Sequence, residues 1–292
     1  MDEIRVIDMN GRFRQDYLLW CANHKEIAAD EDKMDEIFAD MVEKWFDMPK
    51  KWLGGKTPNE YFEDIGDAQM YVTLLIEYKK ADVDCPDALI KCITDRGEET
   101  YPLLLNIIHA NESEDMTADQ LEDIQAACIA LVEEMGEPHP SDRYIELLRD
   151  RTEESDLLDA IAAVMETEQD KALLGKLKDA YLVSSGAGKE VLLEIMSYFY
   201  RDDGVYAILA CEFEEGGADK ASLARCFGRL GDERAIPMLE KELKSEELDY
   251  YLYRSLREAI EELGGDEVED REFYEDRDYD AVAAAGRDGD ES

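Results

Sequence analysis

The spacing of apolar residues predicts helices along most of the chain. In residues 33–46 an apolar side chain recurs every three or four positions, at Met34, Ile37, Phe38, Met41, Val42 and Trp45. This spacing places them on one stripe of a helix, with charged residues on the remaining surface. No segment shows a convincing alternation of apolar and polar residues, which would indicate a strand. We therefore predict an all-α protein.

A loop and a helix start follow this first pattern. Residues 47–57 contain Pro, two adjacent Gly and several Lys, which is typical of a loop. Thr57 suits the N-cap, Pro58 the first helical position and Glu60 the third, so we expect a helix to begin here. The apolar pattern then continues to Ile76.

The middle of the chain contains an internal repeat. The pair Leu230-Gly231 recurs about 33 residues later as Leu263-Gly264, and Met135-Gly136 lies about three such steps earlier. Pro102 and Pro237 are separated by about four steps of 34 residues. Each unit is predicted to be a helix, a short turn and a second helix. Glycine supplies the positive φ that ends the first helix, an acidic residue caps the second, and proline lies near the start of that second helix.

Repeated helix pairs bury their apolar faces by stacking on their neighbours. We therefore predict an α-solenoid of stacked antiparallel helix pairs over residues 85–264, preceded by a divergent helical N-terminal cap over residues 1–84. Residues 265–292 are acidic and poor in aliphatic side chains, so we expect a disordered tail. The alternative for residues 268–279, "VEDREFYEDRDY", is that they fold back over the open end of the stack.

The stretch "CFGRLGDERAIPMLEKEL", residues 226–243, resembles the HEAT-like repeats of the phycobilisome-lyase type. Residues 252–265, "LYRSLREAIEELGG", resemble the first helix of the next unit, but Arg257 stands where the pattern prefers a small residue. Packing at that position is expected to be looser, or capped. The resemblance implies a HEAT-like superhelix over residues 85–264. The family contains both chromophore lyases and binding scaffolds, so the fold alone implies no activity.

The charge of the chain narrows the choice of partners. There are 74 acidic and 32 basic residues, for a formal net charge of −42. Such a surface repels phosphate backbones and anionic membranes, so we expect binding to neither nucleic acid nor membrane. Acidity of this extent also keeps a protein soluble, which is the simpler explanation for it. If it serves binding, a basic protein or peptide is the expected partner.

Cysteine and histidine give no sign of a cofactor. The six cysteines lie in apolar helical patterns and lack zinc or redox spacing, so we expect free, buried thiols, no cofactor and no metal. The charged N-terminus lacks the apolar run of a signal peptide, which favours a cytoplasmic location. The three histidines have no partner at ligand spacing, and "SSGAGKE", residues 184–190, lacks phosphate-loop spacing.

The sequence thus favours a non-enzymatic binding scaffold. The alternative is an enzyme or enzyme-accessory protein that resembles the chromophore-lyase branch. The candidate partner-binding residues are two acids on the second helices, an aromatic and basic group near the C-terminal end, and a basic loop: Glu146, Glu240, Tyr250, Tyr253, Arg254, Lys50, Lys51 and Trp52. Two structural alternatives remain open. In the first, Trp52 plugs the first helix pair. In the second, the tyrosines and Arg254 cover the last hydrophobic edge or are held by the tail.

Overall fold

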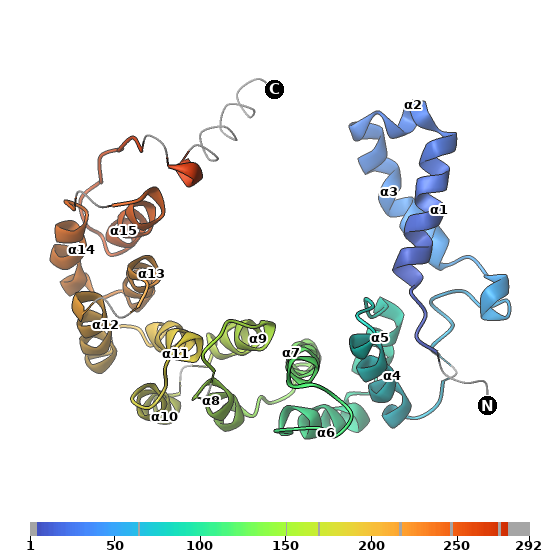
Figure 1. Cartoon of the computed structure of the whole chain (residues 1–292), viewed down its shortest axis with the longest axis horizontal. Helices are drawn as coiled ribbons and strands as arrows, with labels where there is room; N and C mark the ends of the chain where they lie inside the picture. The colour runs from blue at the N-terminus through green and yellow to red at the C-terminus, as the bar shows by residue number, and fades with distance from the viewer. Residues whose placement is uncertain are drawn as a thin grey trace. The chain divides into compact units, whose positions relative to one another are not determined.

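The computed structural model describes residues 5–63, 65–149, 151–168, 170–215, 218–245, 248–273 and 276–279. The chain is 68% helical, and the described residues contain no strand. The prediction of an all-α protein is therefore confirmed. The chain divides into two compact units, Met1–Pro140 and Ser141–Ser292, and each is described here by itself (Figure 1).

In the first unit, residues 9–46 form a helical hairpin and residues 68–135 form a packed helical core. Its elements are α1 (Met9–Asn23), α2 (Lys25–Ala28), α3 (Glu31–Phe46), η1 (Lys51–Leu53), α4 (Ala68–Lys80), α5 (Asp87–Thr94), α6 (Gly97–Ile108) and α7 (Ala118–Met135). Helix α4 packs against α5, α6 and α7. Its fully buried Tyr71 and Leu75 belong to the same core as Leu104 and Ile124. Because α4 shares this core, the boundary that we predicted after residue 84 falls inside a compact unit.

The predicted helix start at Thr57 is wrong, although its local hydrogen bonds form. The Thr57 amide donates to the Glu60 carboxylate, and the Glu60 amide donates to the Thr57 hydroxyl, both at 3.1 Å. Turns follow at residues 58–63, and Gly66 has φ = +128°, a conformation that no helix contains, so a helix could not continue past it. Helix α4 begins at Ala68 instead, with Asp67 as its N-cap. A capping box can therefore close a single turn without starting a helix.

The second unit is a series of helices joined by short turns. It contains α8 (Ser141–Arg149), α9 (Asp156–Met165), α10 (Lys171–Tyr181), α11 (Ala187–Ser197), α12 (Asp203–Glu215), α13 (Lys220–Leu230), η2 (Glu233–Ala235), α14 (Ile236–Glu242) and α15 (Tyr250–Glu262). Alternate helices are neighbours: α9 packs on α11, α11 on α13, and α13 on α15. Helices α8 and α10 are also neighbours, and α10, α12 and α14 pack on α11, α13 and α15 (Figure 1).

The turn glycines have the predicted conformation. Gly136, Gly231 and Gly264 follow α7, α13 and α15 with φ of +68°, +70° and +80°. In this left-handed region only glycine avoids strain, so each residue can end its helix. The predicted place of proline holds for Pro237, the second residue of α14. It is wrong for Pro102, which lies inside α6.

The described part of the C-terminal segment packs against α15. Phe273 is buried, and its ring lies 5.6 Å from Tyr250 and 5.1 Å from Tyr253 between centroids. Residues 266–273 and 276–279 therefore follow the fold-back alternative. The expectation of disorder for residues 280–292 lies outside the described residues.

Candidate functional site

An open hollow crosses three alternate helices of the second unit. It has a volume of about 200 Å³ and lies over α9, α11 and α13. Its walls contain apolar side chains, among them Leu158, Val191 and Leu223. Five carboxylates surround them: Glu154, Asp159, Glu190, Glu194 and Asp219. The hollow can therefore receive a group that has both an apolar stem and a positive charge.

A glycine-rich turn at the start of α11 positions the acidic end of the hollow, which contains Glu154, Glu190 and Asp219. The amides of Ala187 and Gly188 donate to the carbonyl oxygens of Thr152 and Arg151, at 3.3 and 2.9 Å. A Cβ at Gly188 would lie 1.9 Å from the Leu148 carbonyl oxygen, so only glycine permits this approach. The start of α11 is thus held against the loop before α9. The segment "SSGAGKE" has this packing role.

The acidic end has no neutralising cation among the described residues. None of the ion pairs found there involves Glu154, Asp159 or Glu190. Partial burial, together with the charges of Asp219 and Glu154, raises the pKa of Glu190. Asp219 is itself the N-cap of α13 and accepts the Ser222 amide at 2.9 Å. A cation bound here would relieve repulsion between like charges.

Two arginines also line the hollow, and each has partners of its own. Arg229 donates to Glu194 at 2.6 Å and to the Tyr198 hydroxyl at 3.1 Å. Arg225 donates to the hydroxyls of Tyr251 and Ser222, at 2.6 and 2.8 Å. These contacts engage both guanidinium groups, one of them with a carboxylate of the hollow itself, Glu194.

The hollow shows no sign of catalytic or metal chemistry among the described residues. Cys226 lines it, but burial raises the pKa of this thiol to about 11, so it is protonated and weakly nucleophilic at neutral pH. Within the same residues, no group of three or more His, Cys, Asp or Glu side chains is arranged to hold a metal ion. All six cysteines are free, but the prediction that all are buried is wrong: Cys128 and Cys226 are buried, three are half-buried and Cys211 is exposed.

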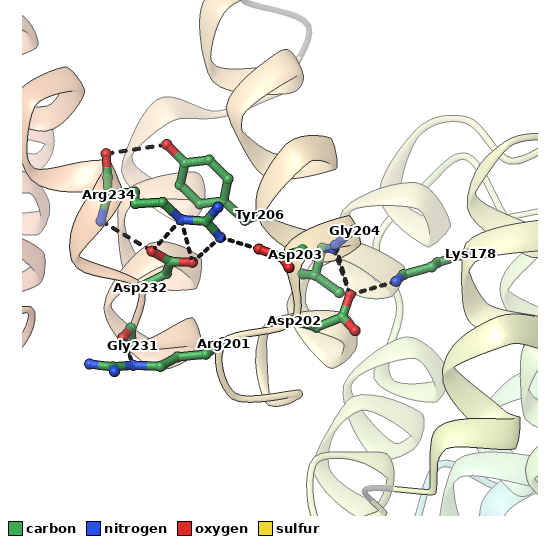
Figure 2. A network of polar contacts seen from close by, with 10 residues as sticks. Lys178, Arg201, Asp202, Asp203, Gly204, Tyr206, Gly231, Asp232 and Arg234 are labelled. Carbon is green, nitrogen blue, oxygen red and sulfur yellow. Dashed lines mark hydrogen bonds and ion pairs between the residues drawn. The ribbon is translucent and has the colours of Figure 1, made fainter.

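A polar network joins successive helix pairs at their turns (Figure 2). Lys178 of α10 donates to Asp202 at 2.6 Å, and Asp202 also accepts the Val205 amide at 2.9 Å at the start of α12. Arg234 donates to Asp232 of its own turn and, at 2.7 Å, to Asp203 of the preceding pair. These contacts neutralise acids at the turns and fix the helix pairs to each other.

Acids on the second helices are also largely engaged. Asp142 pairs with Lys176 at 2.5 Å. Glu212 is buried and accepts hydrogen bonds from Lys189 at 2.7 Å and from Tyr181. Burial alone would raise the pKa of Glu212, but these two hydrogen bonds outweigh it and lower the pKa. Some acids of the second helices are therefore already engaged in internal pairs.

The candidate acids lie apart from each other. Glu146 is exposed on α8 and accepts from Arg143 at 3.4 Å, whereas Glu240 is half-buried on α14. The C-terminal group is brought together on α15. Tyr253 is buried and donates to the Glu269 carbonyl at 2.7 Å, while Arg254 is exposed and pairs with Glu258 at 2.7 Å. The C-terminal segment, rather than a partner, covers Tyr253 in this structure.

The basic loop lies in the first unit beside the helical hairpin. The Lys50 ammonium lies 3.9 Å from the centroid of the Trp45 ring, and Arg12 lies 4.4 Å from that of Trp52. Burial lowers the pKa of Lys50. Trp52 is 40% exposed, and Lys51 is exposed. Trp52 thus packs on the hairpin with only part of its surface, and the guanidinium of Arg12 already covers its ring.

Sequence reasoning missed the acids of the hollow. Glu154, Glu190 and Asp219 precede or open α9, α11 and α13, which are three successive first helices. An acid at a helix start is normally explained by the positive end of the helix dipole, so the pattern gave no separate signal.

Comparison with protein-family models, with curated proteins and with solved structures found no match to this chain. Among the described residues, no helix has both the length and the apolar character needed to cross a bilayer.

Proposed function

We propose that this protein is a non-enzymatic binding scaffold built from HEAT-like repeats, and that its partner is a basic protein or peptide. The contacts of α9, α11, α13 and α15 with one another support the stacked arrangement. So do polar contacts between residues one repeat apart, such as Arg229 with Glu194 and Arg234 with Asp203.

One observation carries the binding proposal: the acidic end of the hollow over α9, α11 and α13. Its carboxylates Glu154, Asp159 and Glu190 face an apolar wall and take part in none of the ion pairs of the described residues. A lysine or arginine side chain from a partner would supply the missing positive charge and place its aliphatic stem on Leu158 and Val191. The net charge of −42 would accelerate the approach of such a partner.

The second-helix acids, represented by Glu146 and Glu240, remain the other candidate contact for a basic partner. For the chromophore-lyase alternative, the thiol that lines the hollow is Cys226, and burial raises its pKa to about 11, so it is a weak nucleophile at neutral pH.

Affinity capture from cells tests this function. The full chain is immobilised, and captured proteins are identified at about 50 mM and at about 300 mM salt. At the higher concentration the screening length falls below 10 Å. We expect a basic protein that is captured at low salt and largely lost at high salt. A variant with Glu154→Gln, Asp159→Asn and Glu190→Gln should capture less of it. An acidic partner, or one retained equally at both salt concentrations, would contradict the proposal.

A further inference from the structure

The contact between α13 and α15 shows what a stacked helix requires here. Ala224 on α13 is fully buried. A Cβ at Gly228 would lie 2.1 Å from a carboxylate oxygen of Glu262 and 3.5 Å from the Cα of Ala259. Small side chains on this face of α13 therefore let α15 approach closely.

The equivalent face of α15 is built differently. With Gly231 and Gly264 as equivalent residues, Ala224 corresponds to Arg257 and Gly228 to Glu261. Arg257 and Glu261 form an ion pair at 2.9 Å. Side chains of this size keep a further helix from packing on α15 as closely as α15 packs on α13. The face can, however, accept an extended segment, which is thinner than a helix.

A segment of this chain occupies that face: residues 266–273 have no regular secondary structure, and residues 277–279 are helical. We call residues 266–273 and 276–279 the C-terminal strap. Phe273 inserts its ring between Tyr250 and Tyr253, and the Tyr253 hydroxyl donates to a strap carbonyl. The Tyr250 amide, at the start of α15, donates to the Asp276 carboxylate at 3.0 Å. Arg257 pairs with the strap residue Asp270.

The strap does not fill the face that it covers. A hollow of about 520 Å³ remains, lined by Tyr250, Tyr253, Arg254 and Arg257 on α15 and by strap residues that include Asp270. The Asp270 side chain is 90% exposed, so its ion pair with Arg257 adds little stability. Phe273 is thus the main buried anchor of the strap among the described residues.

We propose that this face of α15 is a docking surface for an acidic peptide with an aromatic anchor, and that the strap is its built-in occupant. The chemistry of the ligand follows from the contacts of the strap. An aromatic ring enters between Tyr250 and Tyr253, one carboxylate pairs with Arg257, and a second accepts the amide at the start of α15. This surface is separate from the acidic hollow and selects a partner segment of opposite charge.

Only molecules in which the strap is open can bind a competing ligand on this surface. The apparent affinity therefore equals the intrinsic affinity multiplied by the fraction of open molecules. Loosening the strap must therefore raise the affinity for a peptide added in trans. The probe is a fluorescein-labelled peptide with the sequence of residues 266–279, titrated against the full chain and followed by fluorescence anisotropy. Phe273→Ala in the full chain removes the anchor and leaves the docking surface intact.

We expect the Phe273→Ala chain to bind the peptide at least about tenfold more tightly than the unaltered chain does. A second variant, Asp270→Asn with Asp276→Asn, loosens the strap without removing a buried ring and should also bind more tightly. Glu267→Gln, at an exposed strap position, is the matched control and should bind as the unaltered chain does. A peptide that carries Phe273→Ala should not bind. Equal binding by all four chains, or binding of the altered peptide, would overturn the proposal.

Discussion

Replacing Asp232 by alanine should destabilise the second unit far more than the same change at Asp203. Both carboxylates bind the guanidinium of Arg234, at 2.5 and 2.7 Å. They differ in exposure: the Asp232 side chain is 8% exposed, and the Asp203 side chain is 89% exposed (Figure 2). Asp232 also accepts the Arg234 amide at 3.1 Å as the N-cap of η2.

The magnitude follows from these contacts. Loss of an N-cap costs about 1 kcal/mol. Loss of a hydrogen-bonded ion pair whose partner is half exposed costs roughly a further 0.5–1 kcal/mol. Asp232→Ala should therefore lower the free energy of unfolding by about 2 kcal/mol, or the melting temperature by about 4–8 °C for a unit of this size. Asp203→Ala removes only an exposed pair, worth under about 1 kcal/mol.

Chemical and thermal unfolding, followed by circular dichroism between pH 3 and 7, would measure both changes. Hydrogen bonds from Arg234 lower the pKa of Asp232. Its contribution to stability is therefore present above the unfolded pKa of about 4 and is lost as the pH falls through the lower folded value. The difference between the Asp232→Ala and unaltered chains should shrink toward pH 3. Equal losses for the two variants, or a difference independent of pH, would refute the reasoning.

Three further predictions concern the same unit. Gly231→Ala should lower the melting temperature more than Gly264→Ala does. Both residues have positive φ, but only at Gly231 would a Cβ meet another side chain, 2.1 Å from the Tyr200 ring. Equal losses would contradict the packing argument. Glu190→Gln should stabilise the folded state at pH 7, because the raised pKa of Glu190 means that its ionised form is disfavoured there. The gain in stability should disappear as the pH falls below about 4. A loss of stability at pH 7 would show that a positive charge already compensates this carboxylate. Lys189→Met should destabilise more than Lys176→Met, since Lys189 neutralises the buried Glu212 and Lys176 pairs with the exposed Asp142; denaturant midpoints would show the order.

Local signals in the repeats were sufficient to predict the helix pairs. The glycines expected to end the first helices, Gly136, Gly231 and Gly264, do follow α7, α13 and α15. Glycine conformation and acidic caps act over a few residues, so the sequence alone specifies them. Arg257 is also informative, because its departure from a small residue predicted looser packing or a cap, and the strap lies there.

The candidate site could not be predicted in the same way. Whether an acid is free depends on cations and hydrogen-bond donors far away in the sequence, as Glu212 shows with Lys189 and Tyr181. Tyr253 has the same limitation, because a segment that follows α15 buries it. At Thr57 the local capping signal was present, but the tertiary path through Gly66 decided where the helix begins.

The claim that the hollow binds a cationic partner can be measured directly with octalysine as the probe, by isothermal titration calorimetry at 50 mM salt. One variant carries Glu154→Gln, Asp159→Asn and Glu190→Gln in the hollow. A matched variant carries Glu146→Gln, Asp179→Asn and Glu240→Gln on the second helices. Each removes three negative charges, so long-range attraction falls equally in both. We predict that the hollow variant loses at least about tenfold in affinity, or 1.4 kcal/mol, and that the matched variant loses much less. Equal losses in the two variants, or a larger loss in the second-helix variant, would contradict the account.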